Sequence, residues 1–221
     1  MKPISIVVLI LSACVVSVAW GQPLTCTIYT PWAQFHRYNM QRWNPCEKVL
    51  NVNNVGNLGL KWSYATGNRV QSSPAVVNGV VYFGSEDHNV YALKSSIGAK
   101  LWSYTTGDVV ESSPAVAHGV VYVGSFDGNV YALNARTGTK LWSYGTDASV
   151  YSSPAVARGV VYVASEDGTV YALNARTGAK LWSYATGGGV FGSSPAVANG
   201  VVYIGSGDGK IYAFGLKQGQ E

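Results

Sequence analysis

The 221-residue chain contains 26 glycines, 15 tyrosines and seven tryptophans, and only 12% of its residues are charged. This composition is typical of many short strands joined by tight turns, and it excludes a protein built from long helices with patterned charges. The net charge of +4 is modest, and Lys and Arg recur at regular intervals rather than in clusters. A groove for nucleic acid needs a basic stripe, so no nucleic-acid partner is expected.

Residues 1–21 have the features of an export signal. Lys2 provides the positive start, residues 4–18 an apolar run, and Ala19-Trp20-Gly21 small residues at the cleavage positions. The apolar run is short for a membrane-spanning helix. The segment ending at Cys14 also resembles the lipobox of bacterial lipoproteins, in which Cys14 would carry a lipid anchor. We expect an exported protein, periplasmic or extracellular, with an outer-membrane lipoprotein as the alternative.

Residues 22–57 form an N-terminal lead-in that contains the other two cysteines, Cys26 and Cys46. An even pair of cysteines in an exported protein predicts a disulfide, and two free thiols are the alternative. A metal site is not expected here, because two cysteines without suitably spaced histidines do not make a tetrahedral ligand set.

A 40-residue repeat dominates residues 58–216. Trp62, Trp102, Trp142 and Trp182 follow one another at intervals of 40 residues, and segments 112–146 and 152–186 differ at six positions. Self-similarity at this period indicates a stacked or circular repeat architecture. Residues 217–221 are left as a C-terminal tail.

Each unit divides into four strands at its turns. In the unit that begins at Ser112, short apolar and aromatic runs are separated by His118-Gly119, Asp127-Gly128 and Thr137-Gly138. Such pairs are strong hairpin signals, because Gly and Asn accept the positive φ of tight turns. Three hairpins give a four-stranded antiparallel meander, which is one blade of an all-β propeller.

The chain ends suggest how the blades are completed. Four copies of the first three strands are present, but the last copy lacks a Trp-bearing fourth strand, and an extra copy of that strand, residues 60–64, precedes the first unit. We therefore predict a β-propeller of four blades in which the N-terminal strand completes the last blade and removes an exposed edge. An open arc is one alternative. Another is a homodimer that forms an eight-bladed ring, each N-terminal strand completing the partner's last blade.

The third hairpin carries a family signature. Residues 132–142 (ALNARTGTKLW) and their copy at 172–182 resemble the tryptophan-docking motif of pyrroloquinoline-quinone (PQQ) type propeller repeats, although Asn134 and Asn174 stand where the family usually has Asp. The resemblance covers about residues 32–216. It implies the propeller fold and leaves the function open, because one fold hosts many functions.

The tryptophans of this motif are expected to pack between blades. Lys, Trp and Tyr of KLWSY alternate onto one face of an outer strand, where a large aromatic ring can cover the flat turn of the neighbouring blade. The docking residues expected from this pattern are Trp62, Trp102, Trp142, Trp182, Gly98, Gly138 and Gly178.

The resemblance also implies a PQQ-dependent dehydrogenase as an alternative function. Such enzymes are much longer, and the residues that carry their chemistry cannot be mapped onto this chain, so neither a catalytic site nor bound PQQ or Ca²⁺ is expected. The repeated aspartates are interpreted as turn residues that accept their own backbone N–H groups rather than as calcium ligands. They are Asp87, Asp127, Asp167 and Asp208.

The least repetitive residues lie in the turns between second and third strands and in the links between blades, which the strand order places on one face. Variation on a uniform scaffold is what a binding surface looks like. This candidate partner face consists of Arg69, Gln71, Glu86, His88, Asp108, Glu111, Phe126, Asp147, Tyr151, Glu166 and Phe191. The leading hypothesis is a non-catalytic scaffold that binds an envelope or secreted protein, similar to the propeller lipoprotein of the outer-membrane protein assembly machinery.

Overall fold

The computed structural model describes residues 47–216. The predicted export signal, Cys14, the Cys26–Cys46 pair and the tail at 217–221 lie outside the described residues, and the predictions about them stay predictions. Within the described part, no helix has the length and apolarity needed to cross a membrane. A single turn of 3₁₀-helix at Val55–Asn57 precedes the repeats.

The repeats form four antiparallel sheets, which we number as blades 1 to 4 in chain order. Blade 1 consists of β1 (Ala75–Val77), β2 (Val80–Gly84), β3 (Asn89–Lys94) and β4 (Lys100–Thr105). Blade 2 consists of β5 (Ala115–Ala117), β6 (Val120–Gly124), β7 (Asn129–Asn134) and β8 (Lys140–Gly145). Blade 3 consists of β9 (Ala155–Ala157), β10 (Val160–Ala164), β11 (Thr169–Asn174) and β12 (Lys180–Ala185). Blade 4 consists of β13 (Ala196–Ala198), β14 (Val201–Gly205) and β15 (Ile211–Phe214).

The tight turns follow from their residues, as predicted. Between β5 and β6, Ala117 pairs with Val120, so that only His118 and Gly119 lie in the loop. Their φ values are +49° and +77°. Two consecutive positive φ values make a turn whose twist matches that of the flanking strands.

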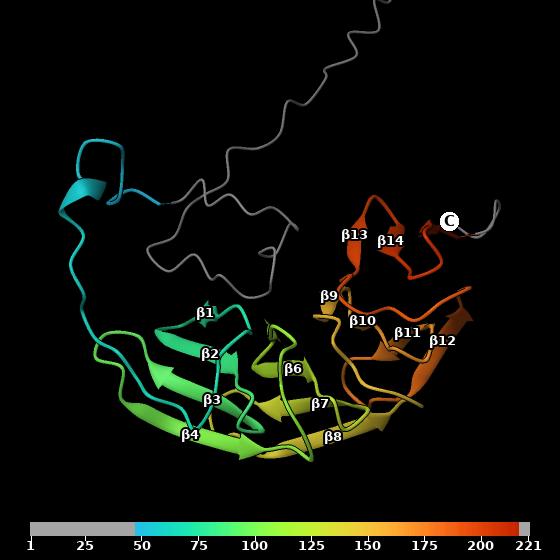
Figure 1. Cartoon of the computed structure of the whole chain (residues 1–221), viewed down its shortest axis with the longest axis horizontal. Helices are drawn as coiled ribbons and strands as arrows, with labels where there is room; N and C mark the ends of the chain where they lie inside the picture. Colours follow the sequence, from blue (N-terminus) through green and yellow to red (C-terminus); the bar gives the residue numbers. More distant parts are fainter. Residues whose placement is uncertain (1–46, 217–221) are drawn as a thin grey trace, which may run out of the picture.

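The blades lie one after another along an arc, and Figure 1 shows their outer strands β4, β8 and β12 on its convex side. Serine side chains join the inner ends of neighbouring blades. The backbone N–H of Ser73 donates to Oγ of Ser113 at 2.9 Å, and the N–H of Ser113 donates to Oγ of Ser153 at the same distance. The all-β propeller architecture predicted from the repeat is confirmed.

Outer strands are joined to the next blade through tryptophan. The indole Nε1 of Trp102 donates to the carbonyl oxygen of Ala135 at 2.9 Å, and that of Trp142 donates to Ala175 at 3.0 Å. Each ring lies flat on a glycine, Gly138 for Trp102, where a Cβ atom would come within 2.7 Å of the indole. Both tryptophans are 9% exposed.

The predicted closure by the N-terminal strand is wrong for the described chain. Residues 60–64 form no strand, and blade 4 remains a sheet of three strands. Four blades close only when each turns by about 90° relative to the last. The four blades here leave an open arc whose two ends lie apart (Figure 1). The angle between neighbouring blades is therefore smaller than the angle that closes a ring of four.

A comparison of two glycine variants would measure what the indole contact requires. Gly138 and Gly119 both have φ values above +70°, but a Cβ at Gly119 meets nothing within 4 Å. We expect Gly119→Ala to cost about 1 kcal/mol through backbone strain. Gly138→Ala adds a steric clash with Trp102, which should lower the free energy of unfolding by about 1–3 kcal/mol more. Denaturant unfolding of both variants measures the difference, and equal losses would show that the flat glycine surface is not needed.

Candidate functional site

The turns between second and third strands and the links between blades lie on one face, which we call the link face. Backbone hydrogen bonds join the two kinds of segment. The N–H groups of Glu86 and Phe126 donate to the carbonyls of Arg69 and Val109, and that of Glu166 donates to Ser149, each at 2.9 Å. The candidate residues expected from the sequence are therefore carried by one rigid network.

A polar cluster lies where blades 1 and 2 meet on the link face. Oε2 of Glu86 accepts from Nε of Arg69 at 3.0 Å, and Oε1 accepts from the amide of Gln71 at 2.6 Å. The same amide reaches Glu111 at 3.3 Å. The Arg69 side chain is largely exposed, so the ion pair contributes little stability, but it fixes the buried Glu86 carboxylate in place.

The cluster continues toward blade 3. Burial raises the pKa of Glu111, and the nearby Glu86 carboxylate raises it further against a smaller opposing effect of Arg69. Burial also raises the pKa of the Tyr151 hydroxyl, with contributions from the charges of Glu166 and Glu111. The ring of Tyr151 packs on Phe126 with centroids 3.8 Å apart. Carboxylates and aromatic rings thus form one continuous surface.

The remaining candidate residues lie around this cluster. Nε2 of His88 is 3.9 Å from the Asp108 carboxylate, and both side chains are about half exposed. Asp147 is exposed. Phe191 is 60% exposed and lies beside the glycine-rich link to blade 4, where its ring comes close to Gly189 and Gly207. Nothing in the described structure ties Phe191 to the central cluster.

The repeated aspartates have a structural role in this face. Oδ1 of Asp127 accepts from the backbone N–H of Asn129 at 2.9 Å, which closes the turn. Oδ2 accepts from the hydroxyl of Tyr131 at 2.6 Å and from the N–H of Gly107, in the preceding link, at 2.7 Å. Asp87 makes the corresponding contacts with Asn89, Tyr91 and Gly67. Asp87, Asp127 and Asp167 each join a blade to the link before it, whereas Asp208 contacts Tyr212 and Lys210 of its own blade.

Charge is separated between the two faces of the propeller. Of the 11 acidic residues of the chain, all except Glu47 and Glu221 lie in the turns and links of the link face. The opposite face, which we call the turn face, is formed by the turns that follow first and third strands, and these turns contain no acidic residue. Its basic residues, including those at the adjoining strand ends, are Lys94, Lys100, Arg136, Lys140, Arg158, Arg176 and Lys180.

The sequence analysis missed this separation. Lys and Arg are evenly spaced along the chain and therefore give no cluster in a linear scan. Their spacing coincides with the 40-residue period, which returns the chain to the same face in every blade. That coincidence was the signal that could have revealed the basic face.

Two observations bear on the PQQ site that the resemblance implies. Within residues 47–216, no group of three or more His, Cys, Asp or Glu side chains is placed to hold a metal ion. The indoles of Trp102 and Trp142 are buried, with their Nε1 atoms bonded to carbonyls of the next blade, so neither ring is free to stack on a quinone.

Two family models match the chain. Residues 98–221 match the family model described as outer membrane protein assembly factor BamB, which is more than half of the chain. The chain belongs to this BamB-type family of PQQ-like propellers. Residues 32–110 also match the model described as glucose/ethanol/alcohol dehydrogenase, beta-propeller domain. Together the two matches cover residues 32–221 and overlap at residues 98–110.

Solved structures show the same two likenesses. BamB from Moraxella catarrhalis is 21% identical over 70% of this chain and 49% of its own length, with a TM-score of 0.60. The quinohemoprotein alcohol dehydrogenase ADHIIG from Pseudomonas putida HK5 is 28% identical over 80% of this chain and 34% of its own, with a TM-score of 0.71. The enzyme from Comamonas testosteroni is 29% identical over 70% of this chain and 27% of its own, with a TM-score of 0.63. This BamB-type chain spans half or less of these proteins.

A search of the curated proteins finds no match to the chain. The comparison therefore depends on the family models and on the solved structures.

The aspartate contacts predict an acid-sensitive contribution to stability. Burial alone would raise the pKa of Asp127, but hydrogen bonds from Tyr131, Asn129 and Gly107 outweigh it and lower the pKa. The stabilisation is therefore present above the unfolded carboxyl pKa of about 3.9 and is lost as the pH falls through the lower folded value. We expect Asp127→Asn to cost about 1.5–3 kcal/mol at pH 7, and the difference from the parent to shrink below about pH 4.

Chemical denaturation at a series of pH values measures this effect. Asp147→Asn is the matched control, because Asp147 is an exposed aspartate of the same face. A loss for Asp127→Asn that equals the control, or that does not change with pH, would contradict the role given to the carboxylate.

Proposed function

We propose that this protein is a non-catalytic, exported β-propeller that binds another protein in the cell envelope through its link face. The observation that carries the proposal is the link face itself. Nearly all the acidic residues and the least repetitive side chains share it, on blades that are otherwise almost identical. Rigid scaffolds commonly present binding residues in this way, on loops at one end of the fold.

The family match supports a place in the envelope. The matching family model is described by an outer membrane protein assembly factor, and the N-terminal sequence has the features of an export signal. By analogy with that description, the partner is a protein and the compartment is the periplasm or the outer membrane. A lipid anchor on Cys14 is the alternative to cleavage of the export signal near Gly21.

The chemistry of the face favours a partner segment with positive charge. Glu86 and Glu111 are held close together by Gln71, and burial, followed by the charge of Glu86, raises the pKa of Glu111. A Lys or Arg side chain placed between them would relieve the repulsion. The adjacent Phe126 and Tyr151 rings offer apolar area and stacking surface for the same side chain.

Site-specific photo-crosslinking in the envelope would test the proposal. A photoreactive phenylalanine analogue at Tyr151 lies on the link face, and the same analogue at Arg176, on the turn face, is the matched control. We expect a discrete protein adduct from position 151 and none from position 176. Adducts at both positions alike, or no adduct at position 151, would overturn the proposed face.

Charge reversal would test the electrostatic part. An ion pair between a surface carboxylate and a cation of the partner contributes about 1 kcal/mol to the free energy of binding. Glu111→Lys should therefore reduce the affinity for the crosslinked partner about five-fold or more. Arg176→Glu, on the other face, should leave it unchanged. The affinity should also fall with added salt, because exposed charges are screened.

A second candidate function is a quinone-dependent oxidoreductase, or part of one. It is favoured by the structural match to ADHIIG, which covers 80% of this chain. Incubation with PQQ and Ca²⁺, followed by dye reduction with alcohols or sugars as substrates, separates the two. We expect no turnover above the protein-free control, and turnover that is lost on unfolding would replace the scaffold proposal by the enzyme.

A further inference from the structure

The first end of the blade array carries an outer strand without a blade. Trp62 donates from Nε1 to the carbonyl of Ser95 at 2.9 Å, and its ring lies on Gly98 as closely as Trp102 lies on Gly138. Tyr64 packs on Tyr91 with ring centroids 5.7 Å apart, as Tyr104 does on Tyr131. Residues 60–64 thus occupy the place of the outer strand of a blade that would precede blade 1, yet they pair with no sheet.

At the other end of the array, blade 4 has no outer strand within residues 47–216. In blade 2, β7 pairs with β6 on one side and with β8 on the other, whereas β15 pairs with β14 alone. The carbonyl of Lys210 accepts from Ser206, on the β14 side. Backbone groups alternate along a strand, so those of Ile211 and Ala213 point to the open edge. An open edge of this kind is a template for another strand.

The face of blade 4 that would pack against a following blade is also uncovered. Tyr203 is 40% exposed, whereas its counterparts Tyr82 and Tyr122 are buried against the following blade. Ile211 is 77% exposed, whereas the valines at its position in blades 1 to 3 are fully buried: Val90, Val130 and Val170. The face therefore has the composition of an interface between blades and no blade on it.

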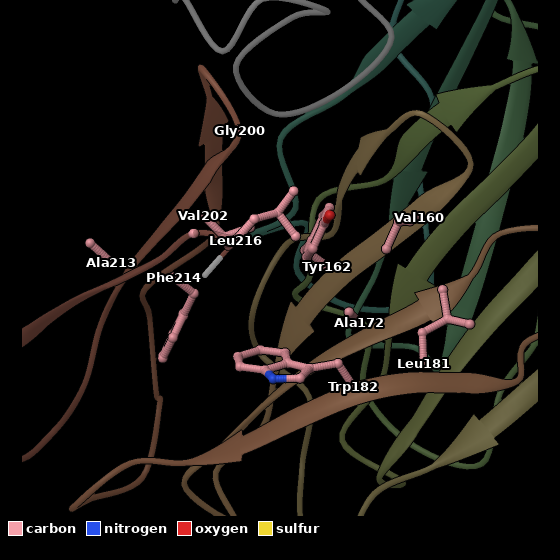
Figure 2. A pocket seen from close by; sticks show the side chains of 11 residues that line it. Val160, Tyr162, Ala172, Leu181, Trp182, Gly200, Val202, Ala213, Phe214 and Leu216 are labelled. Carbon is pink, nitrogen blue, oxygen red and sulfur yellow. The ribbon is translucent and has the colours of Figure 1, made fainter. Parts of the chain in front are cut away.

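The last interface inside the chain is less complete than the others. Trp182 is 38% exposed, compared with 9% for Trp102 and Trp142. A pocket of about 620 Å³ opens beside it, and Figure 2 shows Trp182, Tyr162, Phe214 and Leu216 around this space. The hydroxyl of Ser152 is the one buried side-chain polar atom within residues 47–216 that has no hydrogen-bond partner. Blade 4 is packed less firmly where its outer strand is lacking.

We propose that a second copy of this chain completes blade 4, with residues 60–64 of each copy adding the missing outer strand to β15 of the other. The register follows from the pairs Val130–Tyr144 and Ala132–Trp142 in blade 2. It places Tyr64 opposite Ile211 and Trp62 opposite Ala213. Trp62 keeps its contact with Gly98 of its own chain, because the ring and the strand edge face different neighbours.

The occupant is a second copy because the two ends of one chain do not meet. The four blades leave an open arc, and two arcs related by a two-fold axis form one closed ring of eight blades, within the usual range of four to eight. Each new interface repeats an interface that already exists inside the chain. The two-fold axis coincides with the central axis of the ring, so the acidic link faces of both copies lie on the same side of the ring. This inference is independent of the proposed function, since the assembly forms with or without an envelope partner.

Light scattering of the full chain after size exclusion tests the assembly. We expect twice the molar mass of one chain. Ile211→Lys should reduce it to the mass of one chain, because a charge would be buried against blade 1 of the partner. Leu141→Lys is the control, since Leu141 is an exposed apolar side chain on β8 of blade 2, away from both ends of the array, and it should leave the mass doubled.

A cysteine pair tests the register. Ala65 should lie opposite Lys210, because Gly145 pairs with Asn129 at the same position of blade 2. Facing residues of neighbouring strands are within disulfide range, so Ala65→Cys with Lys210→Cys should give a covalent dimer on a non-reducing gel. Ala65→Cys with Ile211→Cys is the control, since adjacent residues of a strand point to opposite faces. The parent chain, with its native cysteines, is run beside both.

The outcomes separate the alternatives. A doubled mass together with the covalent dimer supports the two-chain ring. A single-chain mass for the parent overturns the proposal, and a disulfide formed within one chain shows instead that the propeller closes on itself. The photo-crosslinking result at Tyr151 is not affected by any of these outcomes.

Discussion

The contact on which the rest of the structure depends is an indole laid flat on a glycine turn. The outer strands β4 and β8 each present a tryptophan whose ring covers the turn of the next blade, while its Nε1 donates to a carbonyl of that turn. The contact needs a large flat ring, a position without a Cβ and a fixed distance along the chain. Repetition of these three conditions at every 40 residues gives each blade the same position relative to the one before it, and the arc follows from that repetition.

The same repetition determines the electrostatics of the molecule. A four-stranded meander returns the chain to the same face twice in each unit, so residues at a fixed place in the repeat accumulate on one side. Nine of the aspartates and glutamates fall in the turns and links of the link face, where Arg69 and Lys210 are the basic residues among residues 47–216. Seven arginines and lysines fall in and beside the opposite turns, which contain no acidic residue. A chain with a modest net charge thereby has one acidic and one basic face. Association with a charged partner is guided by such a distribution more than by the net charge.

The residues that hold the blades together are distinct from those that differ between blades. Asp87 and Asp127 accept from tyrosine hydroxyls and from the preceding link. The indoles of Trp102 and Trp142 donate to carbonyls of the next blade, so these side chains already have partners inside the fold. The residues that differ between blades, among them Gln71, Glu111 and Tyr151, lie on the surface of that network. This division agrees with a scaffold that was repeated first and diversified at its loops.

The sequence by itself determined the repeat, the four strands of each blade and the turns between them, because these depend on local residues: glycine and asparagine at positive φ, and alternation of aromatic and polar side chains. It also identified the candidate face, since strand order alone decides which loops share a side. Only the tertiary structure decided that the arc stays open, that residues 60–64 pair with no sheet, and that evenly spaced basic residues form one face. These features depend on the angle between blades and on the summed path of the chain, which no local pattern of residues encodes.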